Sequence, residues 1–283
     1  MQCICMMASR EFGGRVAYDG GCDLTEETGL QDRLKITAER ALAAMDLTSL
    51  GDSDDAEIVS ALCDRAVTDA GRVAAVCVWP RFIGLCRERL AGKDIPVAVV
   101  VNFPYGGADI GKVVAEIEAA VTDGADEIDL VWPYDKWMTG QHKAATRLLS
   151  VARDTAGDRV LKVILETGRL ADPALIDSAS RAAIEAGADF IKTSTGKVEV
   201  NATPEAAEIM LKVIAETGGS CGFKAAGGIR TVANADIYFQ LADRILGPDW
   251  ATPARFRIGA SGLLDDIIAT LDGVAPAAAA KGY

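Results

Sequence analysis

Three lysines lie inside short apolar stretches of the sequence, where a charged side chain is unusual. Lys162, Lys192 and Lys224 occur in the stretches LKVILE, FIKTST and GFKAAGG. Burial disfavours a charged amine, and a second ammonium group nearby disfavours it further, so the pKa of such a lysine falls. A neutral amine can attack a carbonyl carbon and form a Schiff base. The alternative is structural, because a strand lysine can also reach solvent or pair with a buried carboxylate.

Carboxylates occur in comparable stretches. Asp129 lies in EIDLVW, Asp46 lies in AMDLT, and Glu166 ends the stretch that contains Lys162. Aspartate is disfavoured in strands, so a specific interaction is expected at position 129. Asp129 could transfer protons as a general acid–base, or it could be the counter-ion of a lysine. The sequence leaves both interpretations open.

Two glycine-containing turns could bind an anion. Gly227 and Gly228 precede a helix predicted from Thr231, and the segment GASG at 259–262 precedes a helix predicted at 263–271. Small residues let backbone N–H groups approach an anion, and a helix N-terminus favours negative charge. Lys197, in the stretch TGK, could add a positive charge. Ordinary turns between strands and helices have the same composition, which remains the alternative.

Other motifs are poor candidates for a site. The stretch GGADIGK at 106–112 has the spacing of a nucleotide-binding phosphate loop, but Val113 replaces the hydroxyl residue that such a loop needs. His142 is the only histidine and lies at a predicted helix start, which disfavours a histidine-rich metal site or a Ser-His-Asp triad. The seven cysteines form no CxxC pair, so neither a zinc knuckle nor a disulfide framework is indicated. No metal is expected.

Eight short apolar runs would position the candidate residues. Runs of this kind, with helix patterns between them, repeat about every 25–35 residues, which is the length of one strand–helix unit. The predicted strands are 44–48, 73–79, 97–102, 127–132, 160–166, 189–193, 220–225 and 255–260. Eight such units predict an α/β fold, a (β/α)8 TIM barrel. A doubly wound open sheet is the alternative, but no glycine-rich nucleotide loop follows the first strand.

Composition and charge limit the class of partner. The 283 residues include 29 basic and 41 acidic side chains, a net charge of −12, without a basic run. This disfavours nucleic acid and anionic membranes as partners. The longest apolar runs are far too short to span a membrane, and the N-terminus does not resemble a signal peptide, so a cytoplasmic location is expected.

The chain is expected to form a single domain. We place the barrel at residues 33–272 and an N-terminal extension, of a kind that is often mobile, at residues 1–32. A short flexible C-terminal tail is expected at residues 273–283 because this segment is rich in alanine and low in complexity.

These motifs together resemble the deoxyribose-phosphate aldolase family. The similarity runs in order from residue 41 to residue 271 and also includes VCVWPRF at 76–82, VNFP at 101–104 and FRIGAS at 256–261. The resemblance implies a (β/α)8 barrel without metal or cofactor that reversibly cleaves 2-deoxy-D-ribose 5-phosphate to acetaldehyde and D-glyceraldehyde 3-phosphate. The partner is then a small-molecule substrate. The sequence does not give the oligomeric state, and a homodimer is the form that we consider.

The same resemblance implies roles for individual residues. It makes Lys192 the Schiff-base lysine, Lys224 the partner that lowers its pKa, and Asp129 the acid–base group that acts with a water molecule. Other residues implied in or near the site are Asp46, Lys162 and Tyr283, the last on a mobile tail that assists proton transfer. The residues implied in phosphate binding are Thr195, Lys197, Gly227, Gly228, Gly259 and Ser261.

The chain departs from the family pattern at two positions. Ala225 stands where many members have proline, and Gly262 stands where many have a second serine, so one phosphate-binding hydroxyl is lost. Two other functions are considered: another Schiff-base sugar-phosphate aldolase or transaldolase, and a non-catalytic barrel that binds sugar phosphates. A binding protein needs no amine with a lowered pKa, so the lysine and aspartate set favours an enzyme.

Overall fold

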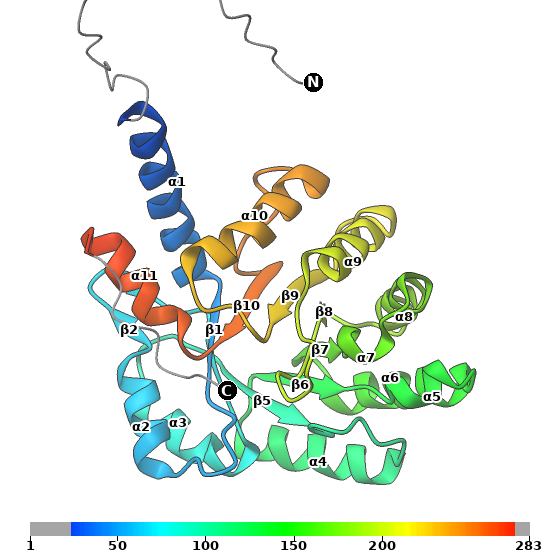
Figure 1. The fold of residues 1–283 in the computed structure, drawn as a ribbon. Helices are drawn as coiled ribbons and strands as arrows, with labels where there is room; N and C mark the ends of the chain where they lie inside the picture. Colours follow the sequence, from blue (N-terminus) through cyan, green and yellow to red (C-terminus); the bar gives the residue numbers. More distant parts are fainter. Residues whose placement is uncertain (1–23, 275–283) are drawn as a thin grey trace, which may run out of the picture.

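Eight parallel strands close into a barrel in the computed structural model, which describes residues 24–274 (Figure 1). The strand order around the barrel is β1-β10-β9-β8-β7-β6-β5-β4. The strands are β1 Met45–Thr48, β4 Ala75–Val78, β5 Val97–Val101, β6 Glu127–Val131, β7 Val160–Ile164, β8 Phe190–Lys192, β9 Gly222–Ala226 and β10 Phe256–Ala260. Each lies within or next to a predicted apolar run. The (β/α)8 prediction is therefore confirmed, and the open-sheet alternative is wrong.

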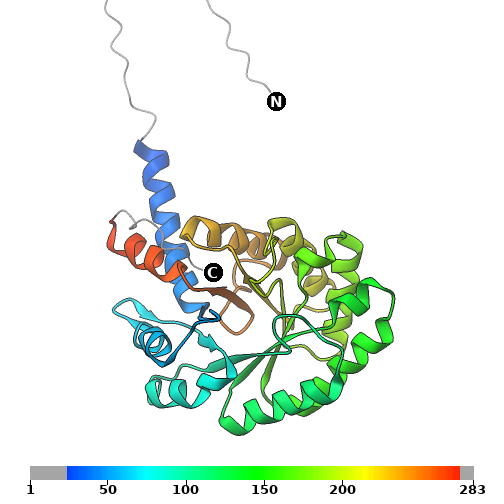
Figure 2. The ribbon, with the colours of Figure 1, turned by 60° about the horizontal axis from the view of Figure 1, so that its bottom comes forward.

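Helices surround the barrel, as Figure 2 shows. The longer helices are α1 Leu24–Ala43, α2 Ala56–Asp64, α3 Ile83–Arg89, α4 Ile110–Asp123, α6 His142–Ala156, α8 Pro173–Glu185, α9 Pro204–Glu216, α10 Val232–Leu246 and α11 Leu263–Asp272. The shorter ones are the 3-10 helix η1 Pro80–Phe82, α5 Tyr134–Met138 and α7 Thr167–Leu170. A two-stranded hairpin, β2 Val67–Thr68 and β3 Gly71–Arg72, was not predicted, because its strands are short and exposed or half-exposed.

Local sequence determines where several helices begin and end. Asp172 directly precedes Pro173, the first residue of α8, and its side chain accepts a hydrogen bond from the Ala174 N–H. Thr203 precedes α9 in the same way, and its side chain accepts one from the Ala206 N–H. In both cases a capping side chain precedes a proline at the start of the helix, a combination that favours a helix N-terminus. Gly124 ends α4 with φ of 99°, a left-handed conformation that glycine adopts without strain.

Helix α1 spans the position at which we expected the barrel domain to begin. Residue 33 lies within this helix, and residues 1–23 and 275–283, with Tyr283, lie outside the described part of the chain. Toward the C-terminal end of α1, Thr37 donates a hydrogen bond of 2.8 Å to Asp236, and Arg40 pairs with Asp243 at 2.7 Å. Both partners belong to α10, so this end of α1 is part of the barrel's outer layer, while its first turns extend beyond α10 (Figure 1).

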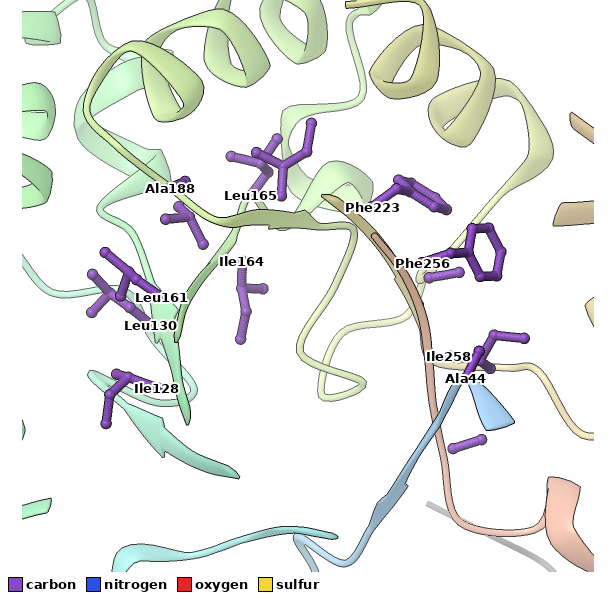
Figure 3. Close-up of a cluster of buried hydrophobic side chains, with 14 of the residues drawn as sticks. Ala44, Ile128, Leu130, Leu161, Ile164, Leu165, Ala188, Phe223, Phe256 and Ile258 are labelled. Atoms are coloured by element: carbon purple, nitrogen blue, oxygen red, sulfur yellow. The ribbon is translucent and has the colours of Figure 1, made fainter. Parts of the chain in front are cut away.

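Apolar residues form one layer outside the barrel and a smaller cluster inside it. The outer layer separates strands from helices, and Figure 3 shows Phe223, Phe256 and Ile258 on the outer side of their strands. The inner cluster consists of Leu50, Ala75, Cys77, Ala98 and Val100, on or near β4 and β5. Successive strand residues face opposite sides, which places these alternate positions inside.

Glycine in β9 allows the barrel to close around Phe190. A Cβ added to Gly222 would lie 2.4 Å from the Phe190 ring and 2.9 Å from the carbonyl oxygen of Arg255. We expect Gly222→Ala to lower the free energy of unfolding by about 1–3 kcal/mol, because the core cannot accommodate the added methyl group without shifting. Urea unfolding measures this difference. The matched control is Gly84→Ala on exposed helix α3, where a Cβ meets nothing within 4 Å. Equal stabilities of the two variants would contradict the prediction.

Candidate active site

Three lysines meet at one carboxylate inside the barrel. Asp129 Oδ1 lies 2.8 Å from Lys162 Nζ, and Asp129 Oδ2 lies 2.7 Å from both Lys192 Nζ and Lys224 Nζ. All four side chains are buried, with at most 2% of any residue exposed. Strand register produces this meeting, because Asp129 pairs with Lys162 and Lys192 pairs with Lys224 across adjacent parallel strands. The structure thus brings together the lysines and the aspartate selected from the sequence.

Asp46 joins this group to a second set of charges. Its Oδ2 atom lies 2.5 Å from Lys224 Nζ and 3.6 Å from Lys162 Nζ, and its Oδ1 atom lies 2.6 Å from Arg257 Nη1. Arg257 Nη2 also lies 3.0 Å from Glu127 Oε1, and Glu127 Oε2 lies 2.5 Å from Lys162 Nζ. The result is one connected network of buried ions, because every charge in it touches at least one of opposite sign.

Glu127 and Arg257 are buried charges that sequence reasoning did not single out as site residues. Glu127 stands two residues before Asp129, and Arg257 stands two residues before Gly259. Residues two apart in a strand face the same side, so an inward Asp129 implies an inward Glu127. This period-two signal was present in the sequence and would have identified both residues.

The buried charges shift the pKa values of the side chains in this network in different directions. Burial alone would raise the pKa of Asp129, but Lys162, Lys192 and Lys224 outweigh burial and hold that pKa well below its ordinary value. Burial lowers the pKa of Lys192; Asp129 opposes this change, and Lys224 adds to it. For Lys224, burial also favours the neutral amine, but Asp129 and Asp46 outweigh it and raise the pKa. Of these two lysines, Lys192 is the one biased toward the neutral form.

Two more buried groups adjoin this network. Cys77 Sγ lies 4.0 Å from Asp129 Oδ2, and burial raises the pKa of this thiol to about 11, so it is protonated at neutral pH. Glu166, directly after β7, accepts hydrogen bonds from the backbone N–H and the hydroxyl of Thr195. Burial raises the pKa of Glu166 despite these bonds. The Glu166 contact connects the end of β7 to the segment after Lys192.

A pocket lies at the carboxyl ends of β8, β9 and β10, with Lys192 in its wall. The residues that line it are Thr48, Lys192, Thr195, Gly196, Ala226, Gly227, Gly228, Ile229, Arg230, Gly259, Ala260, Ser261 and Gly262. Gly227 and Gly228 have φ of 87° and 83°, so the turn after β9 relies on glycine in the left-handed region. Arg230 lines the pocket although sequence analysis assigned it no role; its only signal was its place in the GGIRT stretch.

Five of the six predicted phosphate-binding residues line this pocket, and Lys197 is not among its described lining residues. The Lys197 ammonium instead lies 3.4 Å from Asp52 Oδ1. Within residues 24–274, no group of three or more His, Cys, Asp or Glu side chains could hold a metal ion. In the same range, no helix is both long and apolar enough to cross a membrane.

Lysines buried beside a carboxylate, under a pocket at the carboxyl end of a barrel, suit the chemistry of an aldolase, a carbon–carbon lyase, and the sequence comparisons place the chain in that class. More specifically, the chain belongs to the DeoC/LacD aldolase family, whose sequence model matches residues 40–263. A deoxyribose-phosphate aldolase of Agrobacterium fabrum is 52% identical over 254 residues, which cover 89% of this chain and 98% of that protein.

Solved structures agree with this family. The apo crystal structure of a Toxoplasma gondii protein assigned as a deoxyribose-phosphate aldolase is 27% identical, with a TM-score of 0.78, and the match covers 85% of this chain and 97% of that one. The tetrameric deoxyribose-phosphate aldolase of Aeropyrum pernix shares the fold, with 22% identity and a TM-score of 0.69 over 87% of this chain and 98% of that one.

Asp46 should stabilise the barrel through its buried ion pairs. We expect Asp46→Asn to lower the free energy of unfolding by about 3–5 kcal/mol, because Lys224 and Arg257 each lose a charged partner. Urea unfolding at pH 7 measures the effect. The control is Asp52→Asn, whose side chain is 93% exposed and should change stability by less than about 1 kcal/mol.

The same variant gives a pH test of the network. Burial would raise the pKa of Asp46, but Lys224, Arg257 and Lys162 hold it well below its ordinary value. A depressed folded-state pKa contributes stability that is complete above the unfolded value of about 3.9 and is lost only as the pH falls through the folded value. The difference between wild type and Asp46→Asn should therefore be similar at pH 5 and pH 7. A difference that vanishes at pH 5 would contradict the assignment.

Proposed function

We propose that this protein is a deoxyribose-phosphate aldolase that uses Lys192 as its Schiff-base nucleophile. The observation that carries the proposal is the position of Lys192, whose Nζ atom contacts the Asp129 carboxylate while its side chain lines the pocket. Burial and Lys224 favour the neutral amine, which is the form that attacks a carbonyl carbon. The 52% identity to a deoxyribose-phosphate aldolase supports the choice of substrate.

The reaction then follows from the chemistry of an amine and an aldehyde. Lys192 Nζ adds to C1 of the ring-opened 2-deoxyribose 5-phosphate, and loss of water gives an iminium ion. The C3 hydroxyl loses its proton, the C2–C3 bond breaks, and its electron pair moves toward the iminium, which leaves an enamine and releases glyceraldehyde 3-phosphate. Protonation at C2 and hydrolysis release acetaldehyde and restore the amine.

Asp129 is proposed as the group that moves these protons through a water molecule. Its low pKa keeps it ionised while it contacts all three lysines, so it can accept a proton transiently and stabilise the iminium charge. Lys224 is proposed to keep Lys192 neutral, and Asp46 and Lys162 to hold Lys224 and Asp129 in place. The role of Tyr283 stays a prediction outside the described residues.

The glycine-lined end of the pocket is proposed as the phosphate site. Thr195, Gly227, Gly228, Gly259 and Ser261 would surround the phosphate group with backbone N–H groups and hydroxyls, as small residues at strand-to-helix turns allow. The remaining proposed contributors are Arg230, which lines the pocket, and Lys197, in the segment that follows Thr195. Gly262 also lines it and offers no hydroxyl there.

Assays can distinguish this function from two alternatives. One is another Schiff-base sugar-phosphate aldolase or a transaldolase, and the other is a non-catalytic barrel that binds sugar phosphates. The substrate choice rests on the relative, whereas the amine chemistry rests on the site, so the two can fail separately. The homodimer and the cytoplasmic location stay predictions from the sequence.

Trapping of the Schiff base tests the nucleophile. Incubation with acetaldehyde and sodium borohydride should leave an ethyl group on the Nζ atom of Lys192, because reduction of the imine makes the linkage permanent. With 2-deoxyribose 5-phosphate, reduction before the C2–C3 bond breaks should leave the whole sugar phosphate on the same lysine. Peptide mass spectrometry identifies the modified lysine.

Two variants control this experiment. Lys192→Ala should abolish both the adduct and the cleavage of the sugar phosphate, whereas Lys212→Ala, on the exposed face of α9, should retain both. An adduct on another lysine, or full activity in Lys192→Ala, would refute the assignment. Cleavage of ketose phosphates alone would favour the transaldolase alternative.

Ser261→Ala tests the phosphate site. We expect KM for 2-deoxyribose 5-phosphate to rise about tenfold with little change in kcat, since one hydrogen bond to a charged group is lost. Steady-state kinetics with 2-deoxyribose, which has no phosphate, provides the control, and its kcat/KM should not change. An equal loss for both sugars would place Ser261 outside the phosphate site.

A further inference from the structure

Arg257 is a buried cation of the network that does not line the proposed substrate pocket. Its guanidinium contacts Asp46 and Glu127, and 7% of the residue is exposed. Arg257 instead borders a hollow that is also lined by Ala43, Ala74 and Pro96, next to the amino-terminal ends of β1, β4 and β5. The pocket beside Lys192 lies at the opposite, carboxyl ends of the strands. Arg257 can therefore act on the chemistry only through other side chains.

The network contains one more potential cation than it has carboxylates. Its carboxylates are Asp46, Glu127 and Asp129, and its cationic groups are Lys162, Lys192, Lys224 and Arg257. A guanidinium stays protonated at all accessible pH values, whereas a buried lysine can lose its proton. In a desolvated barrel an unbalanced charge is costly, so the surplus proton leaves from one of the lysines.

The contacts show which lysine holds its proton most weakly. Lys162 lies within 3.6 Å of three carboxylates, and Lys224 within 2.7 Å of two. Among the carboxylates of residues 24–274, Lys192 contacts Asp129 alone, and it shares the Oδ2 atom of Asp129 with Lys224. The pKa shifts agree with this order, because the pKa is raised for Lys162 and Lys224 and lowered for Lys192.

We propose that Arg257 is a positioning residue that keeps Lys192 unprotonated by binding Asp46 and Glu127 and so supplying the fixed fourth positive charge of the network. This proposal rests on the proposed role of Lys192 as nucleophile. With Arg257 in place, Asp46 and Glu127 are partly neutralised, and protonation of Lys192 would leave the barrel with a net positive charge. Without the guanidinium, the three carboxylates would balance three protonated lysines, and Lys192 would hold its proton.

Apart from the ions of the network itself, the described groups around Lys192 and Arg257 supply no positive charge. Asp129, Lys224 and Cys77 face Lys192 from β6, β9 and β4, and Glu166 acts on it from the end of β7. The Cys77 thiol is neutral at physiological pH, and Glu166, whose uncharged form is favoured because burial raises its pKa, is bound to Thr195. Around Arg257, the further contacts are the Phe190 ring, 5.5 Å from the guanidinium carbon, and the Pro253 carbonyl, both of which are uncharged.

The test is the pH dependence of Schiff-base trapping at Lys192 with acetaldehyde and borohydride, measured on the full chain. In Arg257→Gln the midpoint of the acidic limb should move up by about one pH unit, the size expected for unit charges roughly 10 Å apart at an effective dielectric constant of about 20. Well below the midpoint, the trapping rate then falls about tenfold. Arg257→Lys, which retains the charge, should remain close to wild type.

A second variant should shift the pH midpoint of trapping in the opposite direction. Glu127→Gln removes one negative charge and should move the midpoint down, because Lys162 keeps Asp129 and Asp46 as partners and Lys192 remains the most weakly protonated lysine. A merely structural role would alter the rate in both variants without shifting the midpoints in opposite directions. Circular dichroism and urea unfolding check that each variant folds. If Arg257→Gln does not fold, a midpoint that Glu127→Gln leaves unchanged or moves up still overturns the proposal, because charges around the guanidinium would then not control Lys192.

The possible outcomes separate this proposal from the proposed function. Opposite shifts support the role of Arg257, and unchanged midpoints or shifts of the same sign overturn it. Absence of a Lys192 adduct in the wild type at every pH would instead overturn the role of Lys192 as nucleophile, and with it the inference that depends on that role.

Discussion

The barrel depends on one costly arrangement, the burial of ammonium, guanidinium and carboxylate groups in its interior. Removing such charges from water costs several kcal/mol for each ion, and this cost is offset only where each ion is paired closely. Asp129 contacts the Nζ atoms of three lysines at 2.7–2.8 Å, and Asp46 joins Lys224 to Arg257. The charged and apolar parts of the interior are therefore separated, with small apolar residues on β4 and β5 and the ions on the other strands.

The backbone around these ions is adapted to their size. A Cβ on Gly259 would lie 3.0 Å from Lys224 Cε and 3.1 Å from the Ala226 Cβ, so glycine on β10 leaves room for the lysine next to it. The same residue lines the pocket, which places the proposed phosphate site directly above the buried charges. A chain with a net charge of −12 can still receive an anionic substrate there, because Arg230 and the backbone N–H groups of the glycine turns line the pocket.

Sequence patterns predicted the barrel well because its strands are buried on both faces and read as continuous apolar runs. Lys162, Lys192 and Lys224 were visible because charge interrupts those runs. Glu127 was missed because it stands first in its run, where a charged residue is ordinary, whereas Arg257, third in its run, interrupts an apolar stretch as the lysines do but was not selected. The pairing between individual lysines and carboxylates could not be predicted, since it depends on strand register and barrel closure, neither of which a single sequence specifies.

The three buried lysines show that residue type does not set chemical role in this barrel. Each lies in a parallel strand and each contacts Asp129, yet they differ in how many further carboxylates they reach. Lys162 and Lys224 have such partners and are held as cations, whereas Lys192 has only the shared oxygen of Asp129 and faces the pocket. The carboxylates of the network stabilise the protonated forms of Lys162 and Lys224 more than that of Lys192. The proposed nucleophile is therefore set apart by its few carboxylate partners as well as by its position at the pocket.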